Sequence, residues 1–251
     1  MSDFFDPAAK EISGVGELVE FVTGEYAKRK RIIWFRGHSI ATWHVQPSLW
    51  RSYTPEHERN FTTRFRCRAA IRLTGSPSHD DYAGWLSLMQ HYGLPTRLLD
   101  WTRSPLVAAY FAVSPYLDST VEAQDAAIWM LWPHDLNVAE GFEDLTHPID
   151  SNTSRQMLEP AFKDRDENGK VLAVMAVETD LRMFVQQGAF TIHSDRTPLN
   201  RRPTHREYLL PLLIKAANVQ KMAEQIHACG IVRGDIFPDL QSLAEEFKGL
   251  P

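Results

Sequence analysis

The stretch from Gln90 to Ala112, QHYGLPTRLLDWTRSPLVAAYFA, constrains the fold more than any other part of this chain. Its pattern predicts a polar turn, then a short strand, then a capped helix. Gly93 suits a turn because glycine readily adopts a positive φ angle. Residues 97–102 predict the strand, and Ser104-Pro105 predicts the helix start, with serine as N-cap and proline in the first turn. This arrangement commonly presents polar side chains at a cleft.

The predicted strand carries two charged residues, Arg97 and Asp100. Buried charges are rarely kept without a partner or a function. Two interpretations therefore stay open. The two side chains either reach a cleft and bind a ligand, or they pair with each other inside the fold.

Apolar residues elsewhere in the chain predict further strands and helices. They favour strands over residues 32–38, 126–133, 171–177, 189–193 and 208–214. Helical spacing of apolar residues predicts helices over residues 55–73, 82–90, 218–228 and 240–247. Residues 135–168 are polar and lack periodicity, which predicts a long insertion, a lid or a mobile loop. The mixture indicates an α+β fold.

Composition limits the classes of protein. With 251 residues, a net charge of −5 and 43% hydrophobic residues, the chain suits one large globular domain. No apolar run approaches the length of a membrane span, and the N-terminus lacks the features of a signal peptide. Cys67 and Cys229 are far apart and suit a reducing compartment. We therefore expect a cytoplasmic protein without membrane association.

The predicted helix over residues 55–73 is rich in arginine. Two interpretations stay open for these side chains: contact with phosphate, or an ordinary solvated helix surface. The arginines are Arg59, Arg64, Arg66, Arg68 and Arg72.

Several standard motifs of catalysis and metal binding are absent. The sequence has no GxGxxG, Walker A, HExxH, paired CxxC or GxSxG pattern, and no two histidines lie four residues apart in a zinc-like arrangement. No metal site is predicted. The remaining candidates are three polar turns, each inside or after an apolar strand, at residues 36–37, 91–102 and 186–193.

These turns offer the side chains that a nucleotide needs. Arginines can clamp phosphate through two parallel hydrogen bonds, aromatic rings can stack on a base, and carboxylate, hydroxyl and amide groups can orient a ribose. We expect Arg36, Arg97, Asp100 and Gln187 to converge on one cleft. The alternative is that the turns only hold strands together through hydrogen bonds.

Three motifs in order resemble the FRG domain family, which is named after a Phe-Arg-Gly motif. They are WFRG at residues 34–37, QHYGLPTRLLDWT at residues 90–102 with the PLVAAYFA helix, and QQGAFTIH at residues 186–193. The resemblance implies a single FRG-type domain over residues 1–251. Its core would cover about residues 30–195, and residues 196–251 would be a C-terminal continuation.

A second resemblance, to ADP-ribosyltransferases, suggests a function. Those enzymes present an Arg or His near a Gly on an early strand, then a Ser/Thr-bearing strand with a helix of the form VAxxFA, and then a late strand with a Glu. Arg36-Gly37, residues 100–112 and residues 186–190 are similar in order. The resemblance implies a split mixed or antiparallel sheet with flanking helices. It also implies that NAD is the cofactor.

The implied reaction transfers ADP-ribose from NAD to a protein or nucleic acid. The implied biological role is that of a bacterial toxin or an anti-phage effector. Such a role also implies a partner or antitoxin protein. The implied catalytic residues are Arg36, Asp100, Thr102 and Gln187. The implied cofactor-binding residues are Arg36, Gly37, His91, Tyr92, Arg97, Trp101 and Gln186.

One departure from that pattern concerns the expected catalytic Glu. Gln187 stands near its place but cannot act as an anion, and Glu178 is the nearest upstream glutamate. Asp100 is then the best-placed acid in the sequence. The alternatives to an enzyme are a non-catalytic module that binds a nucleotide or nucleic acid, and a purely structural interaction domain.

Overall fold

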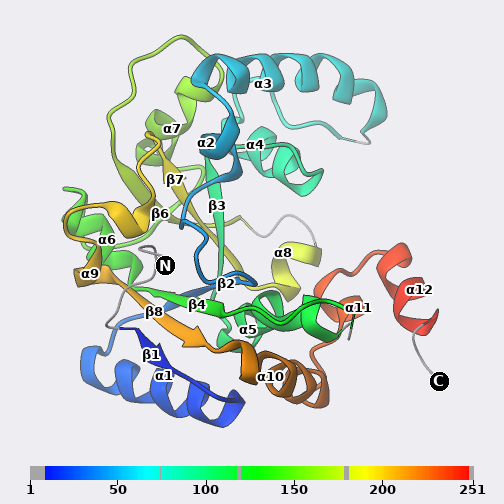
Figure 1. The fold of residues 1–251 in the computed structure, drawn as a ribbon. Coiled ribbons are helices and arrows are strands. Elements are labelled where there is room, and N and C mark those ends of the chain that lie inside the picture. The colour runs from blue at the N-terminus through cyan, green and yellow to red at the C-terminus, as the bar shows by residue number, and fades with distance from the viewer. Residues whose placement is uncertain (1–8, 74, 118–119, 178–180, 249–251) are drawn as a thin grey trace.

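A computed structural model describes residues 9–73, 75–117, 120–177 and 181–248 of the chain (Figure 1). Glu178 lies outside the described residues. The strands are β1 (Lys10–Glu11), β2 (Trp34–His38), β3 (Leu98–Thr102), β4 (Ala126–Leu131), β5 (His147–Pro148), β6 (Val171–Met175), β7 (Gly188–His193) and β8 (Leu209–Ile214).

Helices connect and cover these strands. The α-helices are α1 (Val15–Arg29), α2 (Ser48–Ser52), α3 (Pro55–Ala69), α4 (Tyr82–His91), α5 (Pro105–Val113), α6 (Pro133–Ala139), α7 (Asn152–Leu158), α8 (Leu181–Val185), α9 (His205–Tyr208), α10 (Ala216–Ala228), α11 (Arg233–Ile236) and α12 (Leu240–Lys248). The 3-10 helices are η1 (Ala70–Arg72), η2 (Ser114–Leu117), η3 (Glu159–Ala161) and η4 (Leu199–Arg201).

The strands form one mixed sheet in the order β1-β8-β4-β2-β3-β7-β6-β5. β1–β8 and β5–β6 are parallel pairs, and the other neighbours are antiparallel. β2 pairs with β4 along its whole length, whereas β2 and β3 pair only at Phe35↔Thr102. The sheet therefore opens between β2 and β3, and β3 runs steeply away from β2 in Figure 1.

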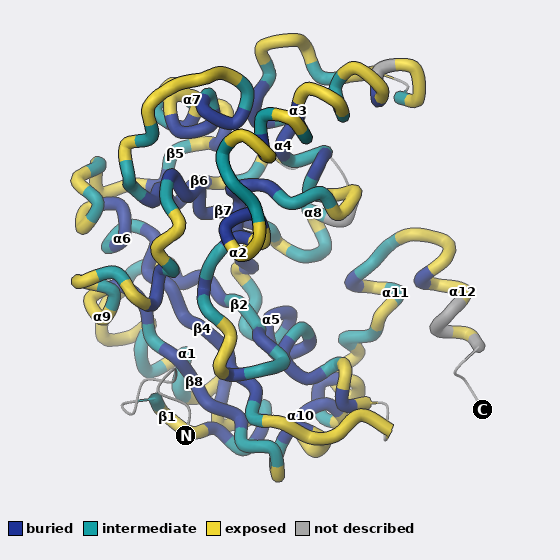
Figure 2. Tube along the Cα trace, turned by 45° about the horizontal axis from the view of Figure 1, so that its top comes forward, coloured by how far each residue is buried: buried dark blue, intermediate teal, exposed yellow. Residues whose placement is uncertain are grey.

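This opening divides the sheet into a first half-sheet, β1-β8-β4-β2, and a second half-sheet, β3-β7-β6-β5. One hydrophobic cluster packs the first half-sheet against α1, α5 and α10, and includes Phe35, Ile128 and Leu212. Another packs the second half-sheet against α4 and α7. A third joins both halves through Trp34 and Trp101. The strands are accordingly the most buried part of the trace (Figure 2).

The structure confirms several predictions from the sequence. The apolar runs form β2, β4, β6, β7 and β8, and the central stretch forms a turn after the end of α4, then β3 and α5 in order. The Ser104 hydroxyl accepts a hydrogen bond from the Val107 amide at 3.3 Å, so it is the predicted N-cap. The mixed sheet with flanking helices is also as expected.

The prediction for residues 135–168 was wrong. This segment holds most of α6, then β5, α7 and η3. The helices α6 and α7 have seven residues each, which is too short for a clear amphipathic period. Tertiary contacts fix the segment instead: the buried Asn137 amide donates to the Leu145 and Ala173 carbonyls and accepts from the Ala173 amide.

None of the described helices is long and apolar enough to cross a bilayer.

Candidate functional site

The strand β2 places its alternating side chains in two environments. Phe35 packs in the cluster beneath α5, while Arg36 and His38 point to the opposite side of the sheet. Gly37 lies directly against α5. A Cβ atom at position 37 would come within 2.0 Å of the Ala108 carbonyl oxygen, which belongs to that helix. Only glycine therefore permits this contact between strand and helix.

Arg36 occupies the opening between β2 and β3. Its Nη1 donates to the Asp100 carbonyl oxygen at 2.6 Å, and its Nε donates to His38 Nε2 at 3.2 Å. The guanidinium thus bonds to a β3 carbonyl at a place where strand pairing has ended. A guanidinium carries five N–H donors. Two hydrogen bonds leave capacity for an anionic ligand.

A pocket of about 340 Å³ lies at this opening. This volume falls within the usual range for small-molecule sites. β2, β3, α4, α5 and α8 all contribute to its lining. Seven residues predicted from the sequence line it: Arg36, Gly37, His91, Asp100, Trp101, Thr102 and Gln186.

Asp100 is the acid of this pocket. Its side chain is 61% exposed, and its Oδ2 lies 3.9 Å from Arg36 Nη1. Gln90 Nε2 donates to Asp100 Oδ1 at 2.6 Å, and the Thr96 hydroxyl donates to the side-chain oxygen Oε1 of Gln90. This chain of hydrogen bonds fixes the carboxylate while most of it stays accessible. Asp100 is the single carboxylate among the described residues of the lining.

Burial governs the titration of the groups beneath the pocket. It lowers the pKa of the Arg36 guanidinium, an effect that the Asp100 charge opposes and the Arg51 charge reinforces. Burial also lowers the pKa of His38 well below its usual value, and the Arg36 and Arg51 charges add to this. His38 is therefore neutral at physiological pH and accepts the hydrogen bond from Arg36 at Nε2.

Comparison with known proteins supports the resemblance to the FRG domain family and does not show the resemblance to ADP-ribosyltransferases. Residues 31–120 match the model of the FRG domain. The matched FRG segment contains the WFRG and QHYGLPTRLLDWT motifs and every protein group that forms the hydrogen bonds of Arg36 and Asp100 described above. No curated protein and no solved structure matches the chain.

The Phe-Arg-Gly motif of the FRG segment combines three different tasks. Phe35 fills the core, Gly37 permits the approach of α5, and Arg36 faces the pocket. Two of the three residues thus serve the fold directly. The motif places its arginine at a fixed point relative to both the strand and the helix.

Arg97 also belongs to the FRG segment, but it does not reach the pocket. Its side chain is fully buried and bonds to both carboxylate oxygens of Glu58, to Glu167 and to the Met157 carbonyl. The expected convergence of Arg97 with Arg36 therefore fails. The alternative, that Arg97 pairs with Asp100, is also wrong: Arg97 is in a buried ion pair, but its partners are Glu58 and Glu167.

Trp101 and Thr102 line the pocket but are committed to the fold. The Trp101 ring is buried, and its Nε1 donates to the Thr191 hydroxyl at 3.0 Å. The Thr102 hydroxyl donates to the Gln186 carbonyl at 2.6 Å and accepts from the Ser104 amide. Neither residue has the open stacking face or uncommitted hydroxyl that the sequence suggested.

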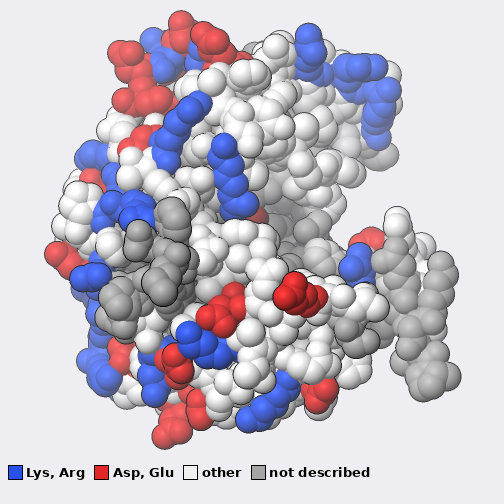
Figure 3. Space-filling model, viewed as in Figure 1, with Lys and Arg blue, Asp and Glu red and all other residues white. Residues whose placement is uncertain are grey.

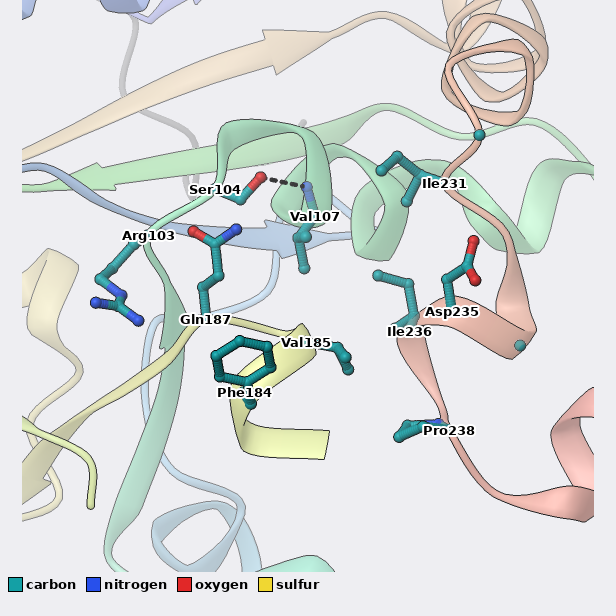
Figure 4. A pocket seen from close by; sticks show the side chains of 12 residues that line it. Arg103, Ser104, Val107, Phe184, Val185, Gln187, Ile231, Asp235, Ile236 and Pro238 are labelled. Atoms are coloured by element: carbon teal, nitrogen blue, oxygen red, sulfur yellow. Dashed lines mark hydrogen bonds between the residues drawn. The ribbon is translucent and has the colours of Figure 1, made fainter. Parts of the chain in front are cut away.

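Gln187 and Tyr92 lie elsewhere. Gln187 has a φ angle of 49° and lines a second cavity of about 750 Å³, where its side chain lies between Phe184 and Ser104 (Figure 4). Tyr92 is 63% exposed and lines neither cavity. Gln186, one residue before Gln187, lines the candidate pocket instead, and its Nε2 also donates to the Ile236 carbonyl.

Sequence reasoning missed Trp43 and Gln90 as site residues. Trp43 is partly exposed in the pocket lining, and its ring lies 6.1 Å from that of His38. It offers the aromatic surface that Tyr92 and Trp101 were expected to supply. Trp43 lies in an aromatic-rich connection and Gln90 begins the central motif, so both signals were present without a reason to assign them. Among the described residues, no cluster of three or more His, Cys, Asp or Glu side chains could hold a metal ion.

Proposed function

We propose that the pocket between β2 and β3 binds NAD and that the protein transfers ADP-ribose to a macromolecule. The observation that carries the proposal is the Arg36 guanidinium. It lies in the opening of a split sheet and faces a pocket of suitable size. Its described hydrogen bonds go only to a carbonyl and a neutral histidine, and its ion pair with the Asp100 carboxylate is long, at 3.9 Å. Such a cation suits a phosphate or pyrophosphate.

The other side chains of the pocket would bind the rings and the ribose of the cofactor. Trp43 would stack on a planar ring of the cofactor, and His91 and Gln186 lie on the lining where they would contact its polar edges. NAD would supply a ribose carbon: a bond from this carbon to the acceptor would form, its bond to nicotinamide would break, and nicotinamide would leave. Asp100 would place negative charge near the ribose, where positive charge develops.

A second candidate is a non-catalytic module that binds a nucleotide or nucleic acid. The observation that favours it is the composition of the lining, where Asp100 is the single described carboxylate and no Glu is present. This module would use the same Arg36 contact and would lack transfer activity. If the protein is the proposed enzyme, its proposed role is that of a toxin or an anti-phage effector, and its proposed partner is a regulatory or antitoxin protein.

Binding is tested by calorimetric titration of NAD into the wild type, Arg36→Ala and Arg36→Lys. Loss of a charge-assisted, two-pronged contact should cost about 2–4 kcal/mol, or two to three decades in affinity. Arg36→Lys should fail nearly as badly, because an ammonium lacks the planar fork. Arg51→Ala is the matched control, since Arg51 influences Arg36 electrostatically but does not line the pocket. A wild type that binds no NAD at millimolar concentration would refute the proposal.

Transfer is tested with labelled NAD and a lysate that contains both proteins and nucleic acids. Asp100→Asn should keep NAD binding within about tenfold, which is roughly 1.4 kcal/mol, and should lose transfer. Label incorporation that depends on Asp100 supports the enzyme. NAD binding without any incorporation by the wild type supports the non-catalytic module.

A further inference from the structure

A stripe of arginines runs along the end of α3 and into η1. Arg64 and Arg68 lie one turn apart on α3, and Arg72 follows in η1, where its Nη1 donates to the Arg68 carbonyl oxygen. All three are exposed, and Figure 3 shows Lys and Arg side chains gathered over this end of α3. We call these three residues the basic stripe.

The basic stripe lacks acidic partners within the described chain. Neighbouring arginines of the same helix are engaged: Arg59 pairs with Asp164, and Arg66 bonds to His79. No described Asp or Glu forms an ion pair with any member of the stripe. In a protein with a net charge of −5, three adjacent cations without a described carboxylate partner form a local positive potential that attracts anions.

An apolar cleft lies beside the basic stripe. It has a volume of about 450 Å³ and is lined by Arg68 and Arg72 together with four apolar or aromatic residues. Those four are Phe65, Ala69, Leu73 and Tyr92. The largely exposed Tyr92 ring therefore stands across a cleft from two guanidinium groups. This is the combination of cation and aromatic surface that accepts an unstacked base beside its phosphate.

The cleft lies next to the candidate functional site. Tyr92 contacts the ring of His91 edge-on, with centroids 5.0 Å apart, and His91 lines the pocket that holds Arg36. Two consecutive residues thus belong one to each lining, so the two cavities are neighbours. A polymer bound along the basic stripe would reach the pocket.

We infer that this surface binds single-stranded nucleic acid and presents it to the pocket as the acceptor. The stripe matches the charge of a phosphate backbone, and the cleft matches the flat face of a base that a duplex keeps stacked. An acidic peptide would satisfy the charges but would leave the cleft without a planar partner. The role as acceptor rests on the proposed function, whereas the binding itself does not.

The test is fluorescence anisotropy on the full chain, without NAD, using a labelled mixed-sequence RNA or DNA strand of about 20 nucleotides. The triple variant Arg64→Gln, Arg68→Gln and Arg72→Gln should bind at least tenfold more weakly at about 0.1 M salt. The slope of log K against log salt should become about two units shallower, since each phosphate contact on a single strand contributes about 0.7.

The matched control removes three positive charges from the opposite end of the molecule. Lys10→Gln, Lys28→Gln and Lys221→Gln change β1, α1 and α10, and should leave binding within about twofold if the site is local rather than a net-charge effect. Tyr92→Ala should weaken binding by about fivefold or more without changing the salt slope, because stacking releases no counterions. Tyr26→Ala, at an exposed tyrosine of α1, is its control.

Three results would overturn the inference. They are equal binding of a duplex of the same sequence, an equal loss in the lysine control, and displacement by an acidic peptide as effective as displacement by the unlabelled strand. Because NAD is absent, failure here leaves the NAD titration unaffected. If the protein binds the nucleic-acid strand but no NAD, the proposed function is refuted, whereas the inference that this surface binds single-stranded nucleic acid still holds.

Discussion

Two arginines of the FRG segment, Arg97 and Arg36, show how similar sequence signals lead to different roles. Arg97 is fully buried, and its guanidinium meets two carboxylates and a carbonyl. Arg36 is 21% exposed and bonds to a carbonyl and a neutral histidine, with its closest carboxylate oxygen 3.9 Å away. One cation is neutralised inside the protein, and the other faces a pocket.

The pKa shifts of the two groups follow from these surroundings. Burial would lower the pKa of Arg97, but the Glu58 charge and the bonds to Glu167 and Glu58 raise it above its ordinary value. Burial lowers the pKa of Arg36, and Asp100 only partly offsets this. A satisfied buried charge holds segments of the fold together, whereas an incompletely satisfied one can bind a ligand. The difference lies in the partners rather than in the arginine itself.

The largest expected effect is the loss of stability on breaking the Arg97 cluster. Arg97→Ala leaves Glu58 buried without its counter-charge and should cost about 3–5 kcal/mol in urea titration. The double variant Arg97→Met with Glu58→Gln removes both charges and should recover part of that loss. A cost below about 1 kcal/mol for Arg97→Ala would show that the cluster is not structural.

Substitution of Gly37 should give the next largest loss of stability. It tests the part of the FRG motif that serves the fold, separately from the part that binds ligand. Gly37→Ala forces α5 away from β2 and should cost about 1–3 kcal/mol. Gly24→Ala in α1 is the control, since no atom lies within 4 Å of its added Cβ, and it should stabilise the protein by about 0.5–1 kcal/mol. Equal unfolding midpoints for the two variants would contradict the close approach of α5.

His193 is a buried histidine that makes stability depend on pH. Its amide donates to the Arg97 carbonyl, and burial followed by the Arg202 and Arg36 charges lowers its pKa from 6.5 to about 3. Below pH 6.5 the unfolded chain binds a proton that the folded chain rejects. Stability should therefore fall on acidification, by up to about 1.4 kcal/mol per pH unit down to the folded pKa.

His193→Gln should flatten this slope, and His227→Gln, at an exposed position of α10, should leave it unchanged. His38 contributes a slope of the same sign, because its pKa is also lowered. Urea titrations between pH 4 and 7 measure the difference. An unchanged slope in His193→Gln would show that His193 does not carry the effect.

The smallest expected effect is that of the pocket residues on stability. Arg36→Ala removes two hydrogen bonds of a half-buried group and should cost about 1 kcal/mol. Asp100→Asn should cost less than about 1 kcal/mol, because its carboxylate is largely exposed. If Arg36→Ala destabilised the protein as much as Arg97→Ala, Arg36 would be a structural residue and the contrast between the two would disappear.

The sequence by itself determined the elements of the central region. Apolar runs located β2, β4, β6, β7 and β8, because a strand buried on both sides needs apolar residues at nearly every position. Ser104-Pro105 located the start of α5 through local capping chemistry. These features depend on neighbours in the chain, so the sequence contains their causes.

Only the tertiary structure decided which polar residues meet. Glu58 and Glu167 lie 39 and 70 residues from Arg97 in the chain, and no local pattern pairs them. A turn of the backbone sends Gln186 into the candidate pocket and Gln187 into the other cavity. The opening between β2 and β3 arises where two half-sheets diverge after one shared pair, since each half packs on its own set of helices. That divergence, which depends on packing across the whole chain, leaves Arg36 facing a pocket and Arg97 enclosed.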